Sequence, residues 1–122
     1  MLSDARQVGF VGVTDLDEAQ RFYGDVLGLD LADARPFALV HQTAATQLRI
    51  TLVEEVIAAP YTVLGWAVAD LESEIDRLTA AGVPFNRYDG MAQDDRGIWS
   101  SPSGARIAWF HDPDGNNLSL EG

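Results

Sequence analysis

The sequence contains no cysteine, and its eight basic residues are all arginine because lysine is absent as well. Without cysteine the chain can form no disulfide, no thiolate metal site and no cysteine nucleophile. The 19 acidic residues give a net charge of −11, and no basic stripe is present that could neutralise phosphates. A nucleic acid is therefore not an expected partner.

Long apolar runs are also missing. No segment approaches the roughly 18 apolar residues that would cross a bilayer, and the first residues, MLSDARQ, lack the apolar stretch of a signal peptide. We expect a cytoplasmic protein with no membrane partner. The 122 residues are 47% apolar, which is typical of one folded domain with its own core.

A weak internal repeat divides the chain. Residues 9–18 and 64–73 share an apolar stretch, then Asp-Leu, then acidic residues, with Asp15 and Asp70 at equivalent places 55 positions apart. Pro60 disfavours helix in the residue before it and marks a boundary. We therefore predict one domain made of module 1–59 and module 60–122.

The first half shows one strand, one helix and further strands. Apolar residues from Leu16 to Leu27 recur at helical spacing, Thr14 or Asp15 can cap that helix, and Gly28 ends it. The predicted elements are strand Val8–Val13, helix Leu16–Leu27, a short strand Leu29–Ala32, and strands Phe37–His41 and Gln47–Glu54.

The second half repeats this order. The predicted elements are strand Val63–Val68, helix Leu71–Ala81, short strands near Phe85–Tyr88, Gly97–Ser100 and Arg106–Phe110, and a last strand Asn117–Leu120. Each half is thus predicted as a β-α-β-β-β module, with one additional short strand in the second half. Neither sheet is large enough to bury both of its faces, so the modules must pair within one chain or between chains.

Two strings point to a known family. The sequence FYGDVLGL at residues 22–29 and the sequence WFHDPDGN at residues 109–116 together resemble the vicinal oxygen chelate superfamily, which includes glyoxalase I, extradiol dioxygenases, fosfomycin-resistance enzymes and bleomycin-binding proteins. The resemblance implies an α+β fold in which two βαβββ modules form a cupped mixed sheet. By the same analogy a homodimer is expected.

The enzymes of that superfamily hold a divalent metal on residues from the inner faces of the cup. Here the corresponding positions carry Val8, Val63 and Ser119, with Thr51 near the fourth. Valine has no lone pair, and a single hydroxyl is a poor ligand for Mn²⁺, Fe²⁺, Ni²⁺ or Zn²⁺. Neither Gln7 nor Glu121 restores the pattern, because each is displaced along its strand. We predict no metal and no other cofactor.

Strand alternation predicts which side chains would line a cup. The predicted lining is Val8, Phe10 and Gly12, then Gln47, Arg49, Thr51 and Val53, then Val63, Gly65 and Ala67, and finally Asn117 and Ser119. Trp66 has helix-facing parity and is assigned to the core. Small and apolar groups with a few polar ones suit an organic ligand.

Arg49, the aromatic residues near the cup and the acidic loop each allow two interpretations. Arg49 could hold a carboxylate or enolate through parallel N–H bonds, or it could form a salt bridge with one of the many acidic residues. Aromatic residues near the cup could stack on a planar ligand or belong to the core; they are Phe37, Tyr88, Trp99 and Trp109. The acidic loop 89–95 could attract a cation or simply be solvated.

Three hypotheses follow. The first is a small-molecule binding protein that holds a hydrophobic or aromatic molecule in a metal-free cup. The predicted ligand-binding residues are Phe10, His41, Arg49, Thr51, Trp99 and Ser119. The second is an enzyme, either a glyoxalase-like lyase or isomerase or a dioxygenase-type enzyme, with a non-standard or absent metal site; candidate acid–base groups are His41, Arg49 and Glu121. The third is a subunit that serves only assembly.

Overall fold

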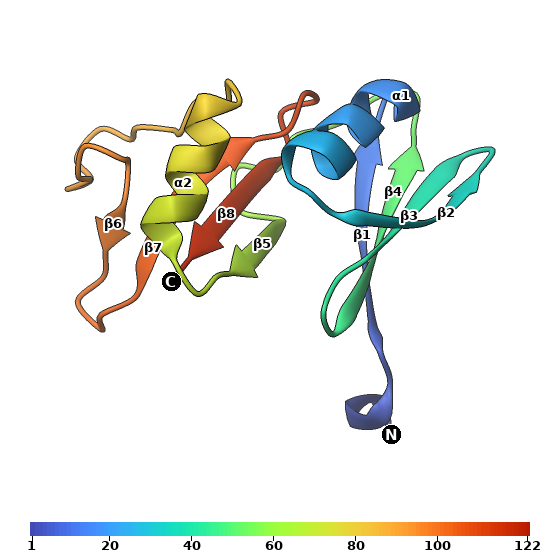
Figure 1. The fold of residues 1–122 in the computed structure, drawn as a ribbon, viewed down its shortest axis with the longest axis horizontal. Coiled ribbons are helices and arrows are strands. Elements are labelled where there is room, and N and C mark those ends of the chain that lie inside the picture. Colours follow the sequence, from blue (N-terminus) through green and yellow to red (C-terminus); the bar gives the residue numbers. More distant parts are fainter. The chain divides into compact units, whose positions relative to one another are not determined.

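The computed structural model describes residues 1–122, and the chain divides into two compact units, Met1–Ile57 and Ala58–Gly122 (Figure 1). No helix in the structure is both long and apolar enough to cross a membrane. Each unit contains one four-stranded mixed sheet and one helical segment, so the α+β class with two βαβββ modules is confirmed.

The first unit is built around the sheet β1-β4-β3-β2, in which β1 and β4 are parallel and the other neighbours are antiparallel. Its elements are η1 (Leu2–Asp4), β1 (Gln7–Val13), α1 (Leu16–Ala19), η2 (Gln20–Val26), β2 (Asp30–Arg35), β3 (Ala38–Gln42) and β4 (Thr46–Leu52). Strand β4 lies between β1 and β3, which places the middle of β4 in the centre of the sheet.

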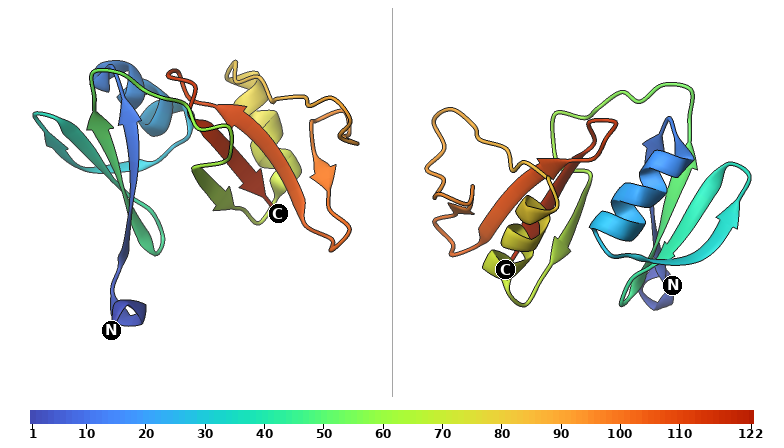
Figure 2. Two further views of the ribbon diagram at one scale, coloured as in Figure 1. Left: turned by 180° about the vertical axis from the view of Figure 1, so that it is seen from behind. Right: turned by 45° about the horizontal axis from the view of Figure 1, so that its top comes forward.

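The helical segment of this unit lies across one face of its sheet (Figure 2). The Asp15 carboxylate accepts a hydrogen bond from the Glu18 amide at 3.1 Å and so caps α1. From Gln20 the segment continues as a π-helix, where the prediction was an α-helix to Leu27. Gly28 then takes a φ of 81°, which favours glycine and ends the helix.

Side chains alternate along β1 and β4 between the two faces of the sheet. The covered face packs against the helix of its unit, and the helix-free face lies opposite. The covered face contains side chains that are almost fully buried: Val11, Val13, Tyr23, Leu39, Leu48 and Ile50. The helix-free face carries Val8, Phe10, Gln47, Arg49 and Thr51, which are exposed or half-buried. The parity predicted for these two strands is confirmed.

The second unit has the sheet β5-β8-β7-β6, again with one parallel pair, β5 and β8. Its elements are β5 (Leu64–Ala67), α2 (Leu71–Ala80), β6 (Trp99–Ser100), β7 (Arg106–His111) and β8 (Asn117–Glu121). Helix α2 covers one face with Leu71, Ile75 and Leu78 (Figure 2). Beneath it Ala108, Phe110, Leu118 and Leu120 are buried.

One predicted strand of this unit is wrong. Residues 85–88 are not in a strand, although the Asn86 amide donates to the Trp109 carbonyl at 2.8 Å. The Gln93 side chain supplies further bonds that a neighbouring strand would otherwise make, accepting from the Tyr88 amide and donating to the Asn86 carbonyl. A loop held by hydrogen bonds from one amide side chain therefore replaces the strand pairing that was predicted for residues 85–88.

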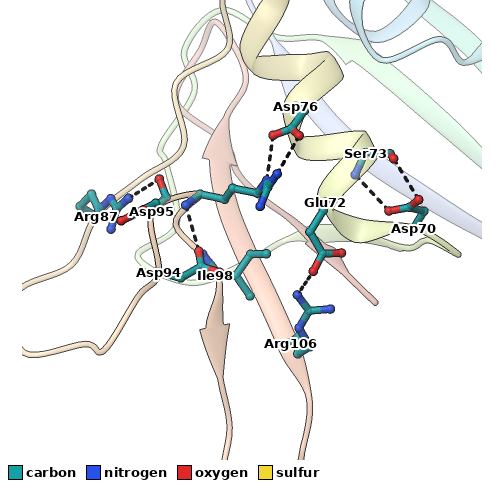
Figure 3. Close-up of polar contacts among 10 residues, drawn as sticks. Asp70, Glu72, Ser73, Asp76, Arg87, Asp94, Asp95, Ile98 and Arg106 are labelled. Atoms are coloured by element: carbon teal, nitrogen blue, oxygen red, sulfur yellow. Dashed lines mark hydrogen bonds and ion pairs between the residues drawn. The ribbon is translucent and has the colours of Figure 1, made fainter.

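Polar contacts connect α2 with the chain that follows it (Figure 3). Asp70 caps the helix by accepting from the Ser73 amide and hydroxyl, which lowers the pKa of the Asp70 carboxyl. Farther along the helix, Asp76 pairs with Arg96 at 2.9 Å and Glu72 pairs with Arg106. The hydrogen bond from each arginine holds the pKa of its carboxyl partner below its usual range.

Candidate functional site

Three aromatic rings gather on the helix-free face of the second unit. Trp109 lies on β7, with Trp99 on the neighbouring β6 at 6.1 Å between ring centroids. Tyr88 approaches Trp109 edge-on at 5.8 Å. All three side chains are exposed or half-buried, so their surfaces are accessible to a planar molecule.

A pocket of about 310 Å³ lies beside Trp109 and within this unit. Its walls include Tyr61, Thr62, Tyr88, Met91 and Asn117. That volume is at the small end of the range found for organic ligands, and the lining is mostly apolar with a few polar groups. A second hollow of about 430 Å³ is bordered only by the N-terminal residues 2–7, which are exposed and include no aromatic ring.

The Trp109 ring is held at its polar edge. Its indole Nε1 donates to the Thr62 hydroxyl at 3.0 Å, and the half-buried ring keeps part of its surface accessible. Thr62 comes just before β5, in a segment that strand parity does not describe. The sequence analysis therefore missed Thr62, together with Tyr61 and Met91, because nothing in their local pattern marks them.

His111 belongs to a chain of hydrogen bonds at the edge of this face. Asn117 donates its amide to the Ala59 carbonyl, which orients its Oδ1 toward His111. His111 Nε2 must then donate to that oxygen, at 2.7 Å, and Nδ1 accepts from Asn86 Nδ2 at 3.2 Å. Both ring nitrogens are thus engaged with asparagine side chains.

Ser119, a predicted ligand-binding residue, lies at the centre of the same face. It pairs in register with Trp109 on one side and with Gly65 on the other. A methyl group on Gly65 would collide with the Ser119 hydroxyl. Glycine at position 65 therefore leaves room for the serine between β5 and β7.

The predicted residues of the first unit lie on its own helix-free face. Phe10 and Arg49 are register partners on β1 and β4, with the guanidinium carbon 5.6 Å from the ring centroid. Thr51 follows Arg49 on the same side of β4. The structure thus brings Phe10, Arg49 and Thr51 together, as the alternation predicts.

His41 is the exception among the predicted residues. It pairs with Leu48, so it lies on the covered face, and it is fully buried under the π-helical segment. Neither ring nitrogen makes a hydrogen bond of good geometry. Burial lowers the pKa of His41, and the backbone of Leu29 and Asp30 offsets this in part. We do not include His41 in the site.

The acidic loop has a structural use. Asp94 accepts hydrogen bonds from the amides of Arg96 and Ile98, both at 2.9 Å. The Asp95 carbonyl accepts from Arg87 at 2.7 Å (Figure 3). These bonds stabilise the turn that leads into β6 and positions Trp99.

The donor set does not fit a metal centre of the type expected from the resemblance. Val8 and Val63 offer no donor atom, and Thr51 and Ser119 offer only hydroxyls. Within neither unit do three or more histidine, aspartate or glutamate side chains gather closely enough to hold an ion. No mechanistic step is therefore derived through a metal.

Comparison with known proteins gives a consistent family. A family model for the glyoxalase/bleomycin resistance protein/dioxygenase superfamily matches residues 7–120. No curated protein matches the sequence significantly.

Solved structures of the same superfamily resemble the whole chain. A member from Sphaerobacter thermophilus is 23% identical with a TM-score of 0.74, covering 99% of this chain and 98% of its own. A lactoylglutathione lyase from Agrobacterium tumefaciens is 18% identical with a TM-score of 0.74, covering 97% and 92%. A glyoxalase family protein from Enterococcus faecalis is 21% identical with a TM-score of 0.71, covering 98% and 97%.

At these identities the solved structures establish the fold, and the family model matches nearly the full length of the sequence. The chain belongs to the glyoxalase/bleomycin resistance protein/dioxygenase superfamily.

Proposed function

We propose that this protein binds a small aromatic or hydrophobic molecule, without a metal, on the helix-free face of residues 58–122. The observation that carries the proposal is the grouping of Trp99, Trp109 and Tyr88 beside the 310 Å³ pocket. Aromatic rings with accessible faces and fixed edges provide large contact areas at a low entropic cost.

The polar groups of the pocket would orient such a ligand. The Thr62 hydroxyl and Asn117 lie on its wall, and each already makes a hydrogen bond that fixes its position. A few fixed polar groups in an apolar pocket give orientation rather than most of the affinity. The ligand class is therefore a planar molecule with a largely apolar surface.

The hydrogen bonds of His111 support binding rather than acid–base catalysis by this residue. A general base needs a free nitrogen within reach of the substrate, whereas both nitrogens of His111 bond to asparagine side chains. One of the similar structures is a lactoylglutathione lyase, so the alternative function that we retain is that of a glyoxalase-like lyase or isomerase. At its sequence identity that structure indicates the fold alone.

The indole N–H signals of the three tryptophans provide the test. A panel of neutral planar aromatics is titrated into ¹⁵N-labelled protein, with substitutions of single tryptophans to assign the signals. Trp99 and Trp109 should shift saturably, while Trp66 on the covered face should not. Equal shifts of all three signals, or none across a chemically diverse panel, would contradict the proposal.

A matched pair of variants adds a control. Trp109→Leu should weaken binding about two- to tenfold, because stacking on one ring contributes about 0.5–1.5 kcal/mol. Trp66→Leu removes the same side-chain type from the covered face and should leave affinity unchanged once stability is accounted for. A saturable turnover of glyoxalase-type substrates by the metal-free protein would instead favour the alternative.

We also propose that the protein is a homodimer. Large apolar side chains such as Phe37 and Ile57 are more than two-thirds exposed in the single chain, which suits a further protein contact. Light scattering during size-exclusion chromatography gives the mass directly. A mass near 13 kDa, that of one chain, would contradict this.

A further inference from the structure

Arg49 is a cation without a carboxylate partner in a strongly acidic chain. Four of the eight arginines form ion pairs with aspartate or glutamate. Arg49 forms none, although it lies in the middle of β4 in the centre of its sheet. The many acidic residues would make a salt bridge the simpler interpretation of Arg49, but the structure contains no such salt bridge.

The neighbouring strands do not neutralise this charge. By register Arg49 lies between Phe10 on β1 and Val40 on β3. The nearest carboxylate along this row is Asp33, beyond Val40 on β2, about 10 Å of sheet away. Asp33 is already bonded to Arg35 at 3.0 Å.

Two polar atoms of this face are buried without a hydrogen-bond partner, Arg49 Nε and Thr51 Oγ1. They belong to residues two apart on the same side of one strand. Unsatisfied buried donors are uncommon in native proteins and call for an explanation such as a missing ligand. The two Arg49 Nη atoms remain at the surface, so the guanidinium has one accessible edge.

Phe10 provides an apolar surface beside that edge. Phe10 is 64% exposed, and the centroid of its ring lies 5.6 Å from the Arg49 guanidinium carbon. At this exposure the Phe10 side chain is free to turn when a ligand binds, and such a ligand would have to reach Nε and the Thr51 hydroxyl. A cation, a hydroxyl and an aromatic ring then face the same ligand volume.

We propose that this face of residues 1–57 binds the carboxylate of a small aromatic acid, with Arg49 as the anchor. A planar guanidinium matches a carboxylate with two parallel N–H bonds, the Thr51 hydroxyl adds a third, and Phe10 packs against the aromatic body. No second cation and no helix N-terminus lies beside Arg49 to favour phosphate instead. The proposal goes beyond the aromatic site of residues 58–122 and does not depend on it.

The composition of the chain allows binding at Arg49 to be tested by NMR. With eight arginines and no lysine, the side-chain Nε–H region holds at most eight signals, and Arg49→Gln assigns one of them by its loss. The probe is 4-fluorobenzoate, with 4-fluorobenzamide as its neutral counterpart and phosphate as a tetrahedral anion, at constant ionic strength. The Arg49 signal should shift saturably with 4-fluorobenzoate alone.

The variants are measured through the ¹⁹F signal of the same probe. Arg49→Gln should abolish saturable binding and Arg49→Lys should weaken it about tenfold, because lysine keeps the charge without the planar fork. Thr51→Val should weaken binding by about threefold and yet raise the melting temperature of the free protein, since an unpaired buried hydroxyl is removed. Arg21→Gln, on the covered side of the unit, deletes the same charge and should change nothing.

Three results would overturn the proposal. They are an equal response to the neutral amide, an equal response to phosphate, and equal weakening by Arg21→Gln. If the Arg49 signal does not respond to 4-fluorobenzoate while the Trp109 signal shifts with the neutral aromatics, this site is rejected and the proposed function stands. A saturable Arg49 shift with 4-fluorobenzoate, together with no Trp109 shift across the whole panel of neutral aromatics, would reject the proposed function and support this site.

Discussion

The indole nitrogen of Trp109 donates a hydrogen bond of 3.0 Å to the hydroxyl of Thr62. The bond joins β7 to the segment that precedes β5, two parts of the chain that are far apart in sequence. It fixes one edge of the Trp109 ring, whose remaining accessible surface borders the pocket. Together with the bonds of Asn117 to Ala59 and of the Val63 amide to the Asn117 carbonyl, it ties this segment to the sheet.

Thr62→Val tests this contact, because it keeps the shape of the side chain and removes the acceptor. We expect a loss of at most about 1 kcal/mol of stability, since the pair is exposed. The Trp109 indole N–H should exchange faster with solvent and shift in the ¹H–¹⁵N spectrum. Thr79→Val, in α2 and away from the pocket, is the control. An unchanged Trp109 signal would show that the bond does not hold the ring.

Gly65→Ala tests the close approach of β5 to Ser119. The added methyl would collide with the Ser119 hydroxyl and lie 3.3 Å from its carbonyl oxygen. We expect a loss of about 1–3 kcal/mol in urea unfolding. Gly9→Ala is the matched control, because its methyl would meet nothing closer than 3.6 Å. The double change Gly65→Ala with Ser119→Ala should recover part of the loss; no recovery would mean that the backbone oxygen dominates.

Much of the fold follows from local pattern. The alternation in β1, β4 and β8 predicts their buried faces correctly, because a strand residue has only two directions to point. Likewise Asp15 and Asp70 cap their helices as their repeated position suggests. These features depend on neighbours in sequence, which the sequence displays.

The remaining features depend on contacts between distant segments. The parity of β3 is set by its pairing with β4, and that register places His41 on the covered face. The segment 85–88 is irregular because the Gln93 side chain, in a loop, takes its hydrogen bonds. Thr62 enters the site through Trp109, 47 residues later. No local periodicity encodes these three relationships.

Arg96→Gln tests the ion pair that links α2 to the loop before β6 (Figure 3). Hydrogen bonding to Arg96 lowers the pKa of Asp76, so the variant should raise that pKa toward the usual value near 3.9. A carboxyl whose folded pKa is lowered stabilises the fold above its unfolded pKa and loses that effect as pH falls through the folded one. Carbon NMR of the carboxyl measures the shift; an unchanged Asp76 titration would contradict the pairing in solution.

His41→Leu should change how stability depends on pH. Burial lowers the folded pKa of His41 below its ordinary value of 6.5, so below that pH the unfolded chain binds a proton that the folded one does not. The free energy of unfolding should then fall as the pH drops below 6.5, with a slope of at most about 1.4 kcal/mol per pH unit from this group.

Leucine cannot titrate, so the variant should lose that part of the slope, and the difference between the two proteins isolates the contribution of His41. At pH 8 the variant should be at least as stable as the wild type, because two ring nitrogens without a hydrogen bond of good geometry leave the core. Urea unfolding from pH 5.5 to pH 8 measures both effects. Parallel curves for the two proteins would mean that His41 is protonated equally in the folded and unfolded states, and that water or a rearranged π-helical segment reaches its ring.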